Sequence, residues 1–141
     1  MKVIGDVLRN YYMVKLEFLS MPAMPTVPMI AQLTAQRFKL SEEHVKQAML
    51  EREALGSTVV AQGISIPHVE LANIKTQGLF LIKDKQQLAL VLIIDQSQPD
   101  EQLIKILQGL LAEQSLEKLR HIKSEEAFKI LIKEVANRVV R

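Results

Sequence analysis

Residues 78–94 read GLFLIKDKQQLALVLII, two apolar runs separated by a short polar stretch. Gly78–Ile82 and Leu88–Ile94 are typical of strands, and a tight connection that begins at Lys83 joins them. The second run is apolar at every position, which is characteristic of a central strand covered on both faces. We therefore expect a sheet enclosed between layers of helices.

Helical periodicity surrounds these two strands. Apolar residues at helical spacing predict helices that begin near Thr26, Ser41, Ser97 and Ser124, each of which has a side chain suited to an N-cap. Polar and apolar residues alternate over 14–18, as in a half-buried strand. Helices interleaved with four to five short strands predict an α/β fold, a mixed sheet flanked by helices.

The composition is that of one globular domain. The chain has 141 residues, of which 48% are hydrophobic, and this is enough apolar material for a real core. No composition shift marks an internal boundary, so we expect a single domain over residues 1–141. Residues 1–13 show helical spacing and are expected to form either an N-terminal linker or an extra helix.

Chemically versatile residues concentrate in one segment. Residues 52–58 read REALGST and residues 63–68 read GISIPH. Pro67 cannot donate to a sheet ladder and favours an extended Ile66, so we expect His68 where a short apolar strand gives way to a loop. A lone histidine is more often a surface or satisfied core residue, and for His68 taken alone that alternative stays open.

Arg52 lies at the end of a buried helix face. The predicted helix over 41–53 buries Val45 and Met49, and the same stripe reaches Arg52 seven residues after Val45. A guanidinium there needs an anionic partner, which Glu53 cannot readily supply because neighbouring side chains on a helix point apart. Either an external anion or a distant carboxylate such as Asp95 would satisfy it.

The combination of histidine, arginine, hydroxyls and glycine amides suits a phosphoryl group carried on a ring nitrogen. A neutral imidazole at His68 is a nucleophile near pH 7, and Arg52 can hold phosphate oxygens through two parallel hydrogen bonds. Ser57, Thr58 and the amide of Gly63 can add further donors. We therefore regard these five residues as a candidate phosphate-binding site.

The same residues resemble a known family. The pattern Arg-Glu, Gly-Ser-Thr and Gly-Ile-x-Ile-Pro-His is similar to that of the mannitol/fructose-type (type 2) enzyme IIA domain of the phosphoenolpyruvate-dependent sugar phosphotransferase system, from about Val14 to Val135. The resemblance implies the enzyme IIA sandwich fold and a cytoplasmic bacterial protein. It further implies that His68 accepts a phosphoryl group from the phosphocarrier protein HPr and that Arg52 steadies the phosphohistidine.

Two departures from the family pattern bear on the partners. Family members that serve a transporter usually carry a second histidine where this chain has Gln102, and they have a longer hairpin than the one after Ile82. Related domains also occur within sugar-responsive transcription regulators. We therefore favour a regulatory module of a transcriptional regulator or antiterminator, with regulator domains in the same chain. A transport-type domain that passes phosphate to enzyme IIB and a degenerate, unphosphorylated scaffold remain alternatives.

Several function classes have little support in the sequence. The chain has no cysteine, a net charge of +2 and only 4% aromatic residues, which argues against thiolate metal sites and against a nucleic-acid surface. The longest apolar run, Leu88–Ile94, is far short of the roughly 20 residues of a membrane span. We expect no cofactor, no metal and no membrane insertion, with His44 solvated and His121 near a helix end.

Overall fold

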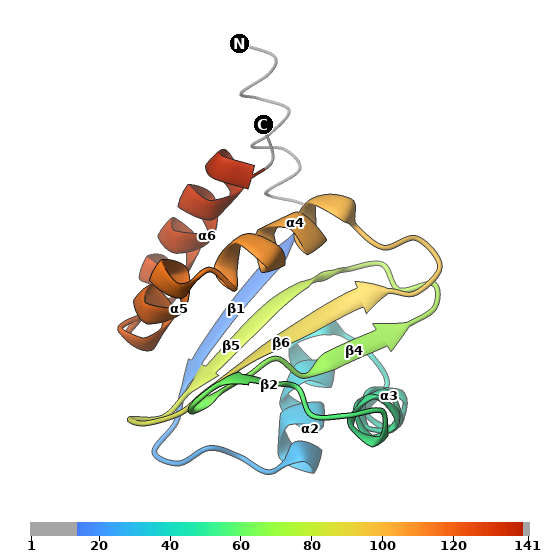
Figure 1. Ribbon diagram of the computed structural model, residues 1–141. Helices are drawn as coiled ribbons and strands as arrows, with labels where there is room; N and C mark the ends of the chain where they lie inside the picture. Colours follow the sequence, from blue (N-terminus) through green and yellow to red (C-terminus); the bar gives the residue numbers. More distant parts are fainter. Residues whose placement is uncertain (1–13, 140–141) are drawn as a thin grey trace.

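The computed structural model describes residues 14–139 and confirms the expected mixed α/β fold (Figure 1). Within these residues six strands form one sheet, and five helices cover it. The strands are β1 (Lys15–Ser20), β2 (Val59–Ala61), β3 (Ile64–Ser65), β4 (His68–Leu71), β5 (Gly78–Lys83) and β6 (Leu88–Asp95). The helices are α2 (Val27–Phe38), α3 (Glu42–Ala54), α4 (Glu101–Leu110), α5 (Glu113–Arg120) and α6 (Glu125–Val139). The linker or helix expected over residues 1–13 lies outside the described residues.

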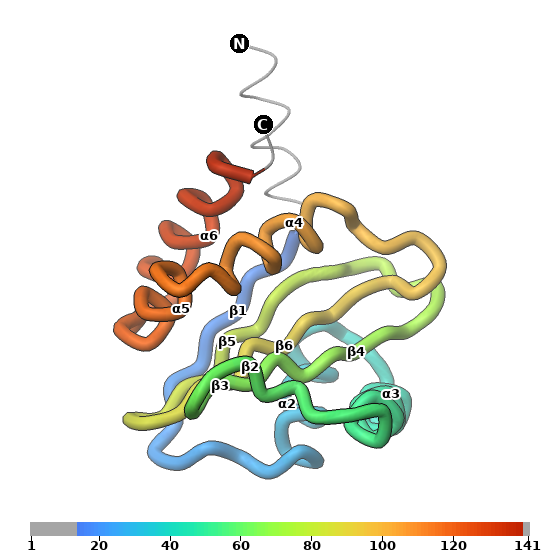
Figure 2. The backbone as a smooth tube through the Cα atoms, viewed as in Figure 1, coloured from blue at the N-terminus to red at the C-terminus, as the bar shows by residue number. Residues whose placement is uncertain are grey.

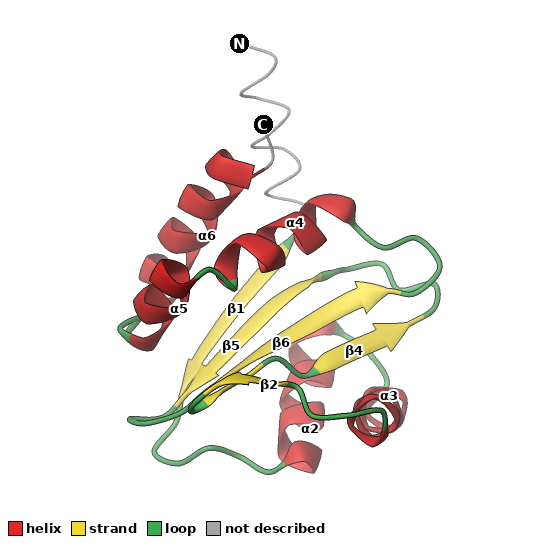
Figure 3. Ribbon diagram, in the orientation of Figure 1, coloured by secondary structure: helices red, strands yellow, loops and turns green. Residues whose placement is uncertain are grey.

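The sheet is built around β6, as its uniformly apolar sequence predicts (Figure 3). The antiparallel β5 occupies one edge of β6, and β1 extends the sheet there as a parallel neighbour of β5. The other edge of β6 carries β3 and then β4, both parallel to it. All eight residues of β6 are buried, because strands flank it and helices cover both of its faces.

Two apolar layers hold the helices against the sheet. On one face, Leu90 and Leu92 of β6 pack with the buried stripes of α4 and α6. On the other face, Val91 and Ile93 pack with residues of α2 and α3, including Met49. The alternation of side chains along β6 therefore sends successive residues to opposite layers. In the described part of the chain, no helix combines the length and the apolar character needed to cross a bilayer.

Most of the predicted helix starts are confirmed by their caps. The hydroxyls of Thr26, Ser41 and Ser124 each accept a hydrogen bond from a backbone N–H three residues later. The start of α4 near Ser97 is wrong: the N-cap is Asp100, whose carboxylate accepts from two amides of the first turn at 3.0 Å each. The amide of Ser97 instead donates to Asp95, which holds Ser97 in the preceding loop.

Candidate functional site

His68 is the first residue of β4, and Pro67 determines how the chain arrives there. The backbone N–H of Ile66 turns away from β6 and donates to the carbonyl of Thr58 at 2.9 Å. The carbonyl of Pro67 accepts from the N–H of Leu92 at 2.8 Å, and β4 then pairs with β6 from His68 onward. The expected loop after His68 is therefore a strand, because this edge of β6 is free to pair with it.

The same segment brings the end of α3 to the edge of β4. Figure 2 shows the chain leaving α3, running as β2 along the edge of the sheet, and returning through β3 into β4. The hydrogen bond between Ile66 and Thr58 ties the outgoing and returning segments together. Residues 52–58 are consequently held beside the start of β4.

The imidazole of His68 is half-buried and favours its neutral form. Burial lowers the pKa of His68 from its usual value of 6.5, and the positive charge of Arg52 lowers it further. The carboxylates of Glu70 and Glu53 oppose this shift. An imidazole whose pKa lies below its ordinary value is largely unprotonated at pH 7, so a ring nitrogen has its lone pair available.

Arg52 lies in the last turn of α3. One terminal nitrogen of its guanidinium donates to the carbonyl of Gly56 at 3.1 Å. Gly56 has a φ of 146°, which favours glycine, and it follows the residue that caps the helix. No carboxylate among residues 14–139 forms an ion pair with Arg52, and the carboxylate of Asp95 instead accepts backbone N–H groups. The remaining guanidinium N–H groups therefore have no carboxylate partner in the described part of the chain.

The two hydroxyl residues after Gly56 are in different situations. Thr58 is buried, and its hydroxyl donates to the carboxylate of Glu53 at 2.9 Å. Ser57 is exposed, and its hydroxyl oxygen accepts from the backbone N–H of Val59 at 3.1 Å. The Ser57 hydroxyl therefore keeps its proton for another acceptor, whereas Thr58 would have to release Glu53 first.

Gly63 is not brought together with His68. It has a φ of 72° in the turn between β2 and β3, and a Cβ there would lie 3.0 Å from the carbonyl oxygen of Gln86. Its carbonyl accepts from the N–H of Leu88, whereas His68 pairs with Leu92. Four residues along a strand correspond to about 13 Å. The conformational reason for glycine at this position is thus the turn beside the β5–β6 hairpin.

Gln102 lies in the first turn of α4 and is half-buried. Its backbone N–H donates to Asp100 at 3.0 Å. His68 pairs with Leu92, whose side chain packs in the layer that contains α4, so the imidazole and the first turn of α4 lie on the same side of the sheet.

Two acidic residues were not singled out as site residues from the sequence. Glu53 was considered only as a poor partner for Arg52, yet it accepts from Thr58 and acts electrostatically on His68. Glu70 is two residues after His68 on the same strand, a spacing that places both side chains on one face. That spacing is the signal that could have identified Glu70. No group of three or more potential metal ligands occurs among the residues described.

Comparison with known proteins identifies a family whose model this chain matches. The model of the family "Phosphoenolpyruvate-dependent sugar phosphotransferase system, EIIA 2" matches residues 28–135. The chain belongs to this family. The EIIA domain is also 39% identical over 54 residues to a "Nitrogen regulatory protein" of Klebsiella oxytoca. That alignment covers 37% of this chain and 33% of the relative, so it spans about a third of the relative's length.

Solved structures share the EIIA fold. The nitrogen regulatory protein IIA-Ntr of Neisseria meningitidis matches with a TM-score of 0.66 and 21% identity, over 92% of this chain and 99% of that one. Enzyme IIAMTL of Escherichia coli, in its complex with phosphorylated enzyme IIBMTL, matches with a TM-score of 0.59 and 17% identity, over 82% and 94% of the two chains. At these identities the likeness shows the fold alone.

Proposed function

We propose that this EIIA domain accepts a phosphoryl group from HPr on the imidazole of His68. The lone pair of an unprotonated ring nitrogen forms the new N–P bond. The N–P bond to the donor histidine breaks, and its electron pair returns to the donor ring. No cofactor or metal is part of this step.

The observation that carries the proposal is the pairing of a half-buried, neutral imidazole with an arginine that has no carboxylate partner among the described residues. The lowered pKa of His68 makes the nucleophile available at neutral pH. Arg52 already donates to Gly56 and has further N–H groups for phosphoryl oxygens, whose charge would supply the missing anion.

The hydroxyls of Ser57 and Thr58 complete the proposed cradle. The hydroxyl of Ser57 can donate to a phosphoryl oxygen while its oxygen still accepts from the backbone N–H of Val59. Thr58 can donate only by exchanging Glu53 for a phosphoryl oxygen, an exchange that the negative charge of the phosphoryl group would favour by repelling Glu53. Gly63 is not part of this cradle because it lies beside Leu88, four residues before Leu92 on β6.

We further propose that the phosphorylated domain serves regulation in the cytoplasm, in one chain with regulator domains or in contact with them. The match to a protein named for nitrogen regulation supports this role, as does Gln102 at the position where transport-type relatives usually have histidine. A glutamine has no charge at any accessible pH, so it stabilises a departing phosphoryl group less than histidine would. Transfer to enzyme IIB for sugar uptake is the second candidate.

Incubation with phosphoenolpyruvate, enzyme I and HPr tests the proposal. We expect one acid-labile phosphate per chain, located on His68 by mass spectrometry, and no labelling of His68→Ala. His44→Ala and His121→Ala are matched controls, since both histidines are exposed and should leave labelling intact. Labelling of His68→Ala at either of those positions would refute the site, and a wild-type chain that stays unlabelled would favour the scaffold alternative.

A further inference from the structure

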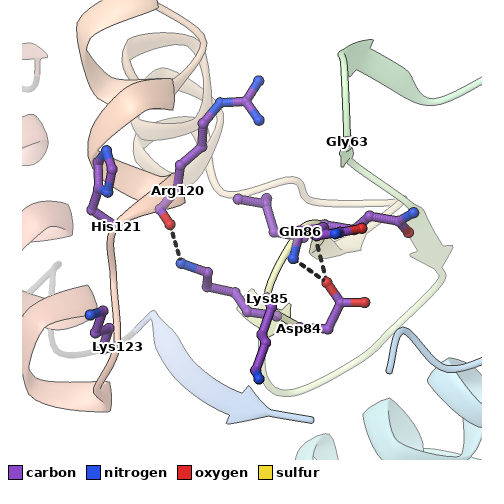
Figure 4. Close-up of a pocket in the computed structure, with 10 residues that line it drawn as sticks. Gly63, Asp84, Lys85, Gln86, Arg120, His121 and Lys123 are labelled. Atoms are coloured by element: carbon purple, nitrogen blue, oxygen red, sulfur yellow. Dashed lines mark hydrogen bonds between the residues drawn. The ribbon is translucent and has the colours of Figure 1, made fainter. Parts of the chain in front are cut away.

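A basic cavity lies where the β5–β6 hairpin meets the C-terminal end of α5 (Figure 4). Its volume is about 410 Å³, within the range of small-molecule sites. An adjoining cavity of about 650 Å³ shares part of this lining. Both cavities are lined by Lys83, Asp84, Lys85, Arg120 and Lys123.

The acidic residue in this lining is held by the hairpin itself. One oxygen of Asp84 accepts from the backbone N–H groups of Gln86 and Gln87 at 2.7 and 2.6 Å. The other oxygen accepts from the N–H of Met24 at 3.0 Å. These bonds fix the carboxylate as part of the turn, so it does not form an ion pair with the surrounding cations.

The cations around the cavity are incompletely neutralised. Among residues 14–139, Lys85 and Lys123 have no carboxylate within ion-pair distance. Arg120 and His121 share Glu117, at 3.2 and 3.8 Å, and its side chain is largely exposed. One solvated carboxylate therefore serves two basic groups, and two ammonium groups remain for an external anion.

Lys83 joins the β5–β6 hairpin to the end of α5. It is only 8% exposed, and its ammonium donates to the carbonyls of Leu119, Arg120 and Ile122 at 3.0, 2.6 and 2.7 Å. All three of its N–H donors are thereby used, and the end of α5 is fastened to the hairpin. Burial lowers the pKa of Lys83, because it removes the charged ammonium from water, and the positive charge of Lys123 lowers it further.

We propose that this pocket binds a small molecule carrying at least two phosphate groups, held by Lys85 from the hairpin and by Arg120 and Lys123 from the end of α5. Lys83 fastens together the two elements that carry these three cations, so all three cations line one cavity. Adjacent phosphate groups can accept charge-assisted hydrogen bonds from both elements at once, which a single carboxylate cannot do. The pocket lies beside Gly63, away from His68, and it does not depend on phosphoryl transfer there.

Titration of the ¹⁵N-labelled protein with inorganic pyrophosphate at about 0.15 M salt, where exposed charges are screened, tests the pocket. We expect saturable amide shifts in residues 84–87 and 120–123. The double variant Lys85→Gln/Lys123→Gln should bind about tenfold more weakly or worse, because two charged donors are lost. Lys133→Gln, an exposed lysine on α6, is the matched control and should bind like the wild type.

Two further variants separate this pocket from other sites. His68→Ala should bind pyrophosphate unchanged, so a failure of phosphoryl transfer leaves this result intact. The proposal is overturned if no saturable shifts occur, if they centre on residues 52–68, or if Lys133→Gln loses as much affinity as the double variant. It is also overturned if binding depends on Lys39 and Lys75, which line a separate cavity between α2 and β5.

Discussion

The middle of β6 and its first residue lie beside different kinds of basic site. Beside Leu92, one guanidinium acts on a neutral imidazole, and two carboxylates moderate its field. Beside Leu88, several cations surround a cavity, and the ammonium of the buried Lys83 binds backbone carbonyls at the end of α5. Positive charge is common to both sites, but the site beside Leu92 holds a half-buried imidazole that favours its neutral form. The difference teaches that charge alone provides binding, whereas group transfer needs a nucleophile whose pKa the surroundings control.

The largest effect on this comparison should come from Arg52. Arg52→Ala should slow phosphorylation of His68 by about tenfold to hundredfold, because a charge-assisted donor contributes roughly 1.5–3 kcal/mol. Arg52→Lys keeps the charge without the paired donors and should give an intermediate rate. The measurement is the rate of label incorporation from HPr, with thermal unfolding as the check on folding. Unchanged kinetics in Arg52→Ala would mean that Arg52 has a purely structural role, through its hydrogen bond to the carbonyl of Gly56.

Lys83 should affect stability and leave the chemistry intact. Lys83→Met removes the donor to three carbonyls at the end of α5 and should lower the free energy of unfolding by about 2 kcal/mol. Lys85→Met, next but one in the same hairpin and exposed, should change it little. Urea unfolding measures both variants. If Lys83→Met instead slows labelling of His68, the two sites along β6 are coupled and the comparison fails.

Gln102 should influence how long a phosphoryl group stays on His68. Gln102→His introduces a group that can be charged, and we expect discharge to an enzyme IIB partner to speed up by about threefold to tenfold, the effect of roughly 1 kcal/mol. The labelled residue should not change. Rapid, saturable discharge of the wild-type domain to a cognate enzyme IIB would contradict the regulatory proposal and support transport.

The smallest effects should appear in the titration of His68. Its NMR-measured pKa should lie below 6.5, rise in Arg52→Gln and fall in Glu53→Gln, because Arg52 lowers it and Glu53 raises it. A lowered pKa in the folded state contributes stability that is present above about pH 6.5 and is lost as the pH falls through the folded value. His68→Ala should therefore flatten the pH dependence of stability in that window. A His68 pKa above 6.5 would invalidate the electrostatic account.

Local signals made much of the fold predictable. The apolar run of β6 and the capping side chains of Thr26 and Ser41 act within a few residues, so their effects can be inferred from the sequence. The start of α4 could not be inferred in this way, because Ser97 and Asp100 are both good N-caps. The hydrogen bond from the N–H of Ser97 to the buried Asp95 decides between them, and it is seen only in the structure.

The site shows the same division. Arg52, Thr58 and His68 are adjacent because one loop returns along the chain that precedes it. Gly63 is nearer to His68 in sequence than Arg52 is. It nevertheless lies beside Leu88, four residues along β6 from Leu92, the partner of His68. Strand register, which sets that separation, depends on pairing with a distant segment and is not written in the spacing of the motif.

Pro67 also has a consequence for the order in which parts of the molecule open. His68 lies on β4, a strand that pairs along one edge with β6 at the centre of the sheet, so opening the backbone of His68 must break part of that pairing. Ser57 and Thr58 precede β2, where Val59 and Val60 are 63% and 44% exposed, and such a segment can open at much lower cost. Pro67 lies between β3 and β4 and so separates the segment of Ser57 and Thr58 from the strand of His68. The two hydroxyls can therefore rearrange around a new anion while the imidazole of His68 stays in place.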